Sequence, residues 1–218
     1  MAICFQPARL VCKVACSLAL FCLTTLTASA NTIVFTVCHE YGCNEETEVY
    51  FPLASWQEIT SLLLEKPESP RSEREHIARV IAGIEKQVGP LTGTQDDRAG
   101  NYADTPNGQM DCIDESTNTT TYLTLLEKNG LLRWHKVSER VRRMPWFIFQ
   151  HWTAVITELK TGKAFAVDSW YLPNGKQPYI QALDSWYKKN PLPYNPDAAS
   201  HQSSRPILQQ LLNEAPSL

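Results

Sequence analysis

The 218-residue sequence lacks several patterns that assign a chain to one of the large protein classes. No internal repeat is visible, which argues against a solenoid or a propeller. No basic patch is visible either, which argues against nucleic acid as a partner. The CxxC and HExxH motifs of common zinc sites are missing, and after residue 30 no apolar run approaches the length of a membrane span.

The first 30 residues have the pattern of a secretory signal peptide. Arg9 and Lys13 provide a basic start, residues 14–26 form an uncharged apolar core, and residues 28–30 (Ala-Ser-Ala) form a small-residue cleavage site. We therefore expect an exported protein, periplasmic or secreted, whose mature chain begins at Asn31 and has no membrane span. A retained anchor helix is the alternative.

Cysteine is scarce after the expected cleavage site, where only Cys38, Cys43 and Cys112 remain. Export places them in an oxidising compartment, in which exposed thiols tend to pair. Cys38 and Cys43 are close enough in sequence for a disulfide that closes a tight turn, which would leave Cys112 as an odd and therefore reactive thiol. A bridge from Cys112 to Cys38 or Cys43 is the competing assignment.

The segment around Cys112 predicts a loop that leads into a helix. Asp111 is a favourable N-cap residue, apolar positions follow at helical spacing, and Gly130 is a typical helix end. With Asp111 as the N-cap, Cys112 is the first helical residue, where free backbone N–H groups and the helix dipole favour a thiolate. The acidic neighbours Asp111, Asp114 and Glu115 act in the opposite direction and raise the pKa of a thiol.

The remaining pattern predicts one α+β domain over residues 31–190, followed by a Pro- and Ser-rich tail over residues 191–218. Two helices are expected to open with capping boxes, at Ser55 and at Ser72. We place Arg140, Arg142 and Arg143 on a solvated loop, with a clamp for an anionic substrate group as the alternative. The other expected elements are strands at 32–37, 48–51, 146–159, 164–170 and 179–180, helix ends at 66 and at Gly89-Pro90, and a short helix at 182–189.

His151 and Asp168 lie on the two strands of the predicted hairpin. With a two-residue turn at Thr161-Gly162, Asp168 would face Val155, which shares a strand face with His151. The two side chains would then be four residues apart along the strand, roughly 13 Å, which is too far for a hydrogen bond. A direct pair requires a wider turn, a bulge or strong strand twist.

The chain order Cys, His, Asp resembles that of the papain-like and transglutaminase-like thiol enzymes. The strings that carry the resemblance are Gln109-Met110-Asp111-Cys112, His151-Trp152-Thr153-Ala154-Val155 and Phe165-Ala166-Val167-Asp168-Ser169-Trp170. Their spacing is similar to that of arylamine N-acetyltransferases and of bacterial transglutaminase-like cysteine proteinases, and the resemblance covers residues 108–180. It implies an α+β fold in which N-terminal helices precede a nucleophile helix packed on an antiparallel sheet.

The same resemblance implies roles for individual residues. Cys112 would be the nucleophile, His151 the base and Asp168 the group that orients it. The backbone N–H of Cys112 would donate to the oxyanion, with Gln109 as the nearest candidate for a second donor. The implied activity is acyl transfer from an amide of a protein or peptide through a thioester, as a cysteine peptidase or by transfer to an amine, without cofactor or metal.

Alternatives to this interpretation remain. A non-catalytic exported binding or accessory protein that retains the fold agrees with the acidic neighbours of Cys112. A zinc site made by Cys112, His151 and Asp168 agrees by ligand type, although no supporting motif is present. Trp152 and Trp170 are candidates for the lining of a substrate cleft, but aromatic residues also build cores.

Overall fold

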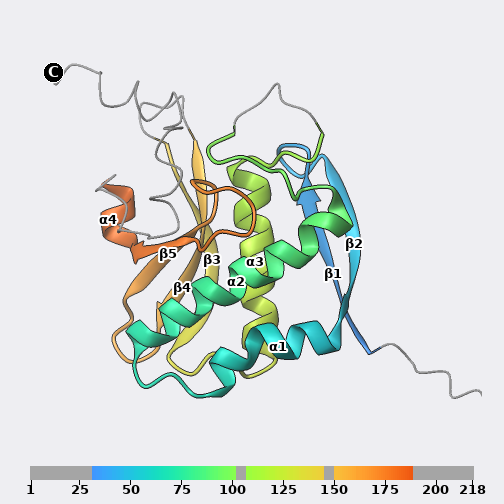
Figure 1. Ribbon diagram of the computed structural model, residues 1–218. Helices are drawn as coiled ribbons and strands as arrows, with labels where there is room; N and C mark the ends of the chain where they lie inside the picture. The colour runs from blue at the N-terminus through green and yellow to red at the C-terminus, as the bar shows by residue number, and fades with distance from the viewer. Residues whose placement is uncertain (1–30, 102–106, 145–149, 189–218) are drawn as a thin grey trace, which may run out of the picture.

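We describe the protein from a computed structural model, which covers residues 31–101, 107–144 and 150–188. The expected signal peptide, the expected tail at 191–218 and the first residues of the strand expected at 146–159 lie outside these ranges. Within them the chain forms two antiparallel sheets and four helices, so the expected α+β class is confirmed (Figure 1). None of the helices in these ranges is long and apolar enough to cross a membrane.

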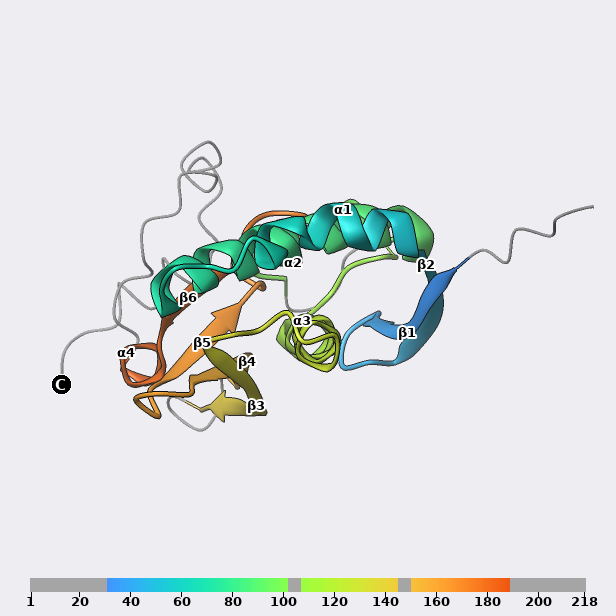
Figure 2. The ribbon, with the colours of Figure 1, turned by 90° about the horizontal axis from the view of Figure 1, so that it is seen from below.

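The smaller sheet pairs β1 with β2, and the larger one has the strand order β3-β4-β5-β6. α3 lies between the two sheets, and α1 and α2 run across one side of this arrangement (Figure 2). In chain order the elements are β1 (Thr32–His39), β2 (Glu45–Pro52), α1 (Leu53–Leu64), α2 (Pro70–Thr92), α3 (Cys112–Lys128), β3 (His135–Arg143), β4 (His151–Glu158), β5 (Ala164–Asp168), β6 (Tyr179–Ala182) and α4 (Leu183–Tyr187).

The core forms around α3, whose inner face carries Tyr122, Leu123 and Leu126, all almost fully buried. On one side Tyr122 meets Phe35 of β1 edge-on, with 5.7 Å between the ring centroids. On the other side α3 packs against β4, which contributes Ile156 to the same core. Each such buried side chain stabilises the fold by about 1.5–3 kcal/mol, so the helix that begins at Cys112 is fixed by packing on both sides.

Both expected capping boxes are wrong, because the chain provides an earlier helix start in each case. α1 begins at Leu53, directly after β2, where Pro52 is the N-cap residue and the Leu53 N–H donates to the Asn31 carbonyl at 2.8 Å. α2 begins at Pro70, since a proline at the first helical position sacrifices no helical hydrogen bond. Its N-cap is Ser69, whose hydroxyl oxygen accepts from the Ser72 N–H at 3.1 Å.

The expected end of α2 at Gly89-Pro90 is also wrong. The helix continues through Pro90 to Thr92 and ends at Gly93, which has the left-handed φ of 78° that favours glycine. Gly89 serves another purpose, because a Cβ there would lie 2.9 Å from Cα of Gln95. Gly89 therefore permits the close approach of the following loop to the helix.

The solvated loop expected at Arg140, Arg142 and Arg143 is in fact part of β3. The strand pairs with β4, with Arg142 opposite Trp152, and the register shifts by one residue between Ser138 and Val141. This β-bulge surrounds Arg140. The guanidinium groups of Arg140, Arg142 and Arg143 are therefore positioned by the pairing of β3 with β4 and not by a solvated loop.

Candidate active site

The β4–β5 hairpin brings the predicted base and its predicted partner together. Its turn is wider than the two residues expected: the Glu158 N–H donates to the Lys163 carbonyl at 2.8 Å, which leaves a four-residue loop. Val155 consequently pairs with Ala166, and the register moves by two residues. Because an even shift preserves the strand face, the offset between His151 and Asp168 falls from four residues to two, a diagonal that side chains can span.

His151 and Asp168 are joined by a hydrogen bond of 2.7 Å between Nε2 and Oδ2, and both side chains are buried. The same carboxylate oxygen accepts from Nε1 of Trp186 at 2.7 Å. Rings of Trp170, Tyr171 and Trp186 surround the imidazole, with centroids 4.8, 5.0 and 5.6 Å away. The imidazole is thus held in one orientation by an acceptor and by aromatic packing.

Arg143 fixes part of this aromatic enclosure. Its guanidinium lies 4.4 Å from the Trp186 ring centroid, and its Nη2 donates to the Tyr171 hydroxyl at 2.6 Å. A further hydrogen bond joins Nη1 to the Trp186 carbonyl. Arg143 therefore contacts two of the rings that hold His151, a role that the sequence pattern did not reveal.

The free nitrogen of His151 distinguishes it from a purely structural histidine. Since Asp168 accepts from Nε2, the neutral ring carries its lone pair on Nδ1. Nδ1 is buried and has no hydrogen-bond partner among the residues that the structure describes. His135 differs: its Nδ1 pairs with Glu73 at 2.7 Å, and its Nε2 lies 3.1 Å from Nη1 of Arg74.

Cys112 begins α3 as predicted. Oδ1 of Asp111 accepts from the N–H groups of Ile113 at 2.8 Å and of Asp114 at 3.0 Å, while Oδ2 of Asp114 accepts from the Asp111 N–H at 3.1 Å. This reciprocal arrangement is a capping box, with Asp114 in the place that Glu or Gln usually takes. It fixes the backbone that presents the Cys112 side chain.

The Cys112 sulfur lies against the backbone on both sides of His151. Its thiol donates to the Gln150 carbonyl at 3.9 Å, and the Trp152 N–H donates to the sulfur. Cys38 and Cys43 form a disulfide, which leaves Cys112 as a free cysteine. The first turn of α3 and the start of β4 thus meet at this sulfur.

Burial is the main determinant of the acidity of Cys112, a residue that is only 4% exposed. Loss of solvation raises the pKa of the thiol to about 12, and the charges of Asp111 and Asp168 act in the same direction. The Trp152 N–H opposes them, because it stabilises the thiolate. The sulfur therefore carries its proton at neutral pH until a base removes it.

Arg140 supplies a positive charge near this sulfur. Its Nη1 donates to the Ile113 carbonyl at 3.3 Å and to the hydroxyl oxygens of Ser116 at 3.1 Å and Thr117 at 2.7 Å. Burial lowers the pKa of Arg140, and the negative form of Cys112 raises it, so the two charges interact. The β3 bulge thus places a cation on the first turn of α3.

The side chain of Gln109, the candidate oxyanion donor, holds the loop before Cys112. Its Nε2 donates to the Asp96 carbonyl at 3.0 Å, and its Oε1 accepts from the Arg98 N–H at 3.1 Å and from the Asn101 amide. The oxyanion role stays a prediction, because it requires the second amide hydrogen of Nε2.

The two tryptophans proposed to line a cleft lie in different environments. Trp170 is buried beside His151, and its Nε1 donates to the Asn101 carbonyl at 2.9 Å. Trp152 is half-buried, with Arg140 and Arg142 at 5.3 and 5.5 Å from its ring centroid. Of these two residues, Trp152 is the one that combines a partly exposed aromatic surface with nearby cations.

The sequence analysis did not reveal that the carboxyl groups of Glu85, Asp97 and Glu115 are buried. Burial raises the pKa of Glu85 to about 8, that of Asp97 to about 7 and that of Glu115 well above its usual value. Asp97 also accepts from the Met110 N–H at 2.7 Å, which ties the cluster to the loop before Cys112. The burial of Glu85 could have been predicted from its position, because it lies four residues after Ile81 and therefore on the apolar face of α2.

Other binding features are sparse in the described ranges. They contain no group of three or more His, Cys, Asp or Glu side chains that could hold a metal ion. A hollow lies beyond the end of α3, about 25 Å along the helix axis from Cys112. Its lining residues are Leu63, Lys66, Gly130, Leu131 and Arg133.

Comparisons of the chain with protein-family models, with curated proteins and with solved structures found no match. The case for a function therefore depends on the chemistry of the residues themselves. The features that bear on it are a thiol at a helix start, a carboxylate that holds an imidazole, and the buried Nδ1 of this imidazole. Nδ1 has no hydrogen-bond partner among the described residues, Cys112 included.

Proposed function

We propose that this protein is an exported thiol enzyme of papain-like or transglutaminase-like fold, with Cys112 as nucleophile, His151 as base and Asp168 as the orienting acceptor. The observation that carries the proposal is the state of His151, which is bound to Asp168 through Nε2 at 2.7 Å while its buried Nδ1 has no partner in the described ranges. The Cys112 sulfur contacts the backbone of the two residues that flank His151, namely the Gln150 carbonyl and the Trp152 N–H. The substrate class is an amide of a protein or peptide.

The proposed reaction begins from the neutral thiol. Nδ1 of His151 takes the proton from Sγ of Cys112 as the sulfur attacks the acyl carbon, and the carbonyl oxygen becomes an oxyanion that the Cys112 N–H stabilises. Asp168 stabilises the imidazolium that forms. The C–N bond then breaks, and His151 transfers its proton to the leaving amine, which yields a thioester.

The thioester is resolved by a second nucleophile, either water or an amine. His151 removes a proton from it as it attacks the acyl carbon, the C–S bond breaks, and the sulfur recovers the proton. A pKa of about 12 for Cys112 favours proton transfer during the attack over a preformed thiolate. The rate should therefore depend strongly on His151, since general-base catalysis typically contributes about 10²–10⁴-fold.

The proposal is tested by the alkylation of Cys112 with iodoacetamide at about pH 6, where a free cysteine with its ordinary pKa is almost entirely protonated. Wild-type protein should react faster than cysteine in a short peptide, and His151→Ala should remove the difference. The matched control is His135→Ala, which breaks the other buried histidine–carboxylate pair. It should leave the reaction of Cys112 unchanged under conditions where the variant is folded.

A wild-type rate no higher than that of the peptide thiol would contradict the proposal, as would an equal loss in both histidine variants. If the enhancement is present, assays on glutamine-containing proteins distinguish the two outcomes of the thioester. Release of peptide fragments indicates hydrolysis, and incorporation of a labelled amine indicates transfer.

A non-catalytic binding or accessory protein with the same fold is the second candidate. It is favoured by the burial of Cys112 and by the high pKa that this burial produces. Such a protein would show slow alkylation of Cys112 that is independent of His151. The same experiment therefore separates the two candidates.

A further inference from the structure

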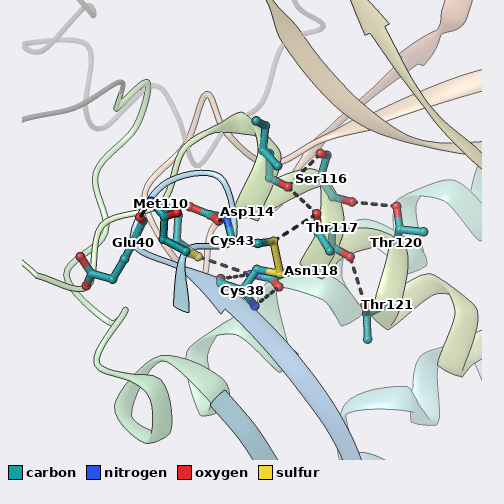
Figure 3. Close-up of a disulfide and its surroundings, with 12 residues drawn as sticks. Cys38, Glu40, Cys43, Met110, Asp114, Ser116, Thr117, Asn118, Thr120 and Thr121 are labelled. Atoms are coloured by element: carbon teal, nitrogen blue, oxygen red, sulfur yellow. Dashed lines mark hydrogen bonds between the residues drawn. A yellow bond between two sulfur atoms is a disulfide. The ribbon is translucent and has the colours of Figure 1, made fainter. Parts of the chain in front are cut away.

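The loop closed by the Cys38–Cys43 disulfide docks on the start of α3 (Figure 3). The Cys43 N–H donates to Oδ1 of Asp114 at 2.5 Å. The side-chain amide of Asn118 pairs with the backbone of Cys38, accepting from its N–H and donating to its carbonyl, both at 2.8 Å. Both halves of the disulfide are thereby attached to the first two turns of the helix.

The same loop also contacts the chain before Cys112. Oε1 of Glu40 accepts from the Gly108 N–H at 2.5 Å, and the Glu40 N–H donates to the Gln109 carbonyl at 3.2 Å. The loop therefore contacts the chain on both sides of Cys112, although it is about 70 residues away in sequence.

Asp114 links the disulfide-closed loop to the N-cap residue of α3, because its carboxylate binds both. One carboxylate oxygen accepts from Cys43, and the other accepts from the N–H of Asp111, which itself caps the helix. Thr117 provides a second link, because its hydroxyl oxygen lies 3.7 Å from Sγ of Cys43 and accepts from Arg140. A displacement of Cys43 would therefore move groups that surround Cys112.

The loop conformation needs a constraint to persist. Glu40, Tyr41, Gly42 and Cys43 all have left-handed φ angles, of 62°, 62°, 72° and 58°. Residues with a Cβ are disfavoured in this region, and a run of them survives only where its surroundings hold it. The covalent link between Cys38 and Cys43 closes this turn, so its loss should let the loop relax away from α3.

We propose that the disulfide-closed loop is a positioning element for Cys112, with Cys38, Cys43, Glu40 and Asp114 as its positioning residues. The inference rests on the proposed function insofar as Cys112 is the nucleophile. It adds that the reactivity of this thiol depends on an oxidised Cys38–Cys43 pair. A reduced loop would loosen the capping of α3 and displace the Cys112 sulfur from its contacts with Gln150 and Trp152, the two neighbours of His151.

The test compares the full chain with the double variant Cys38→Ser/Cys43→Ser. Hydrogen exchange of the Ile113 and Asp114 amides should become at least about tenfold faster, as expected when a hydrogen bond to a charged group is lost. Site-resolved alkylation of Cys112 across pH should lose most of its His151-dependent component at about pH 6. Amides in the second half of α3, such as those of Leu123 and Leu126, should retain their protection.

A milder pair of variants keeps the test decisive if the double variant does not fold. Glu40→Ala removes the acceptor for the Gly108 N–H and leaves the disulfide intact, whereas Glu40→Gln retains an acceptor oxygen. We expect the alanine variant to shift exchange and alkylation in the same direction as the double variant, and the glutamine variant to resemble wild type.

Unchanged exchange at Ile113 and Asp114 after loss of the disulfide, together with an unchanged pH profile of alkylation, would overturn the positioning role. An equal effect of His135→Asn, at the opposite end of the β3–β4 pair, would overturn it too, since this result would indicate general destabilisation. Failure of the proposed function has a different signature. In that case wild-type Cys112 shows no enhancement that depends on His151, while the exchange at Ile113 and Asp114 still reports on the loop.

Discussion

His135 and His151 lie at opposite ends of the β3–β4 pair, and each contacts a carboxylate oxygen at 2.7 Å. The difference between them is the second ring nitrogen. In His135 it contacts Arg74, and in His151 it is buried without a partner among the described residues. The molecule thus contains a structural histidine–carboxylate pair and, on the same sheet, a second pair whose histidine has one nitrogen without a hydrogen-bond partner in the described ranges.

Replacing Asp168 with Asn separates a catalytic role from simple electrostatics. The negative charge of Asp168 raises the pKa of Cys112, so on electrostatics alone its removal should make the thiol more reactive. If Asp168 orients His151 and stabilises its protonated form, the alkylation rate at about pH 6 should instead fall by about a hundredfold. The measurement is the pH dependence of Cys112 alkylation, and a faster reaction in Asp168→Asn would exclude the orienting role.

Arg140 should increase the acidity of Cys112. Arg140→Met removes the cation that interacts with the sulfur, so the pKa of the thiol should rise. Alkylation near neutral pH should slow by about three- to tenfold, since one pKa unit corresponds to a tenfold change in thiolate. Arg142→Met is the matched control, because Arg142 contacts the same Trp152 ring from the same strand. Equal slowing in both variants would assign the effect to packing on Trp152.

Glu85 should make the stability of the fold depend on pH. Burial raises its pKa from 4.5 to about 8, so the folded state binds this proton more tightly than the unfolded chain does. Its contribution to stability is therefore complete below about pH 4.5 and is lost as the pH rises towards about 8. Asp97 and Glu115 face the same cluster and act in the same direction.

The variant Glu85→Gln should remove part of this dependence, because it cannot ionise and still offers an oxygen to the Gly175 N–H. Urea unfolding at about pH 5 and about pH 8 measures the difference in the free energy of unfolding. Glu75→Gln is the control, since Glu75 is exposed on the same helix. A pH dependence that is identical in Glu85→Gln and wild type would show that the other carboxyl groups dominate.

Glu73 should contribute to stability without influencing Cys112. Its carboxylate accepts from the N–H groups of Arg133 and Trp134 and from His135, and the side chain is fully buried. Glu73→Ala leaves these donors unpaired and should cost about 3–5 kcal/mol of the free energy of unfolding. Urea unfolding tests the loss. The alkylation profile of Cys112 in the folded variant should match that of wild type, and a shifted profile would contradict the separation of the two histidine pairs.

The start of α3 could be predicted because its causes are local. Asp111 accepts hydrogen bonds from residues two and three positions later, so the cap and the placement of Cys112 follow from a few adjacent residues. The hairpin strands were likewise visible in their β-forming composition. The capping boxes at Ser55 and Ser72 failed for a related reason: Pro52 and Ser69 provided helix starts only a few residues earlier.

By itself the sequence determined the α+β class, the start of the Cys112 helix and the strand face shared by His151 and Asp168. Tertiary structure alone decided that the hairpin loop has four residues, which brings those two side chains within 2.7 Å. It also decided the contact of Arg140 with the first turn of α3 and the burial of Glu85. The physical reason is the sequence distance over which each feature is determined. Helix capping and strand alternation depend on neighbours within a few residues, whereas strand register, burial and charge contacts depend on which distant segments pack together.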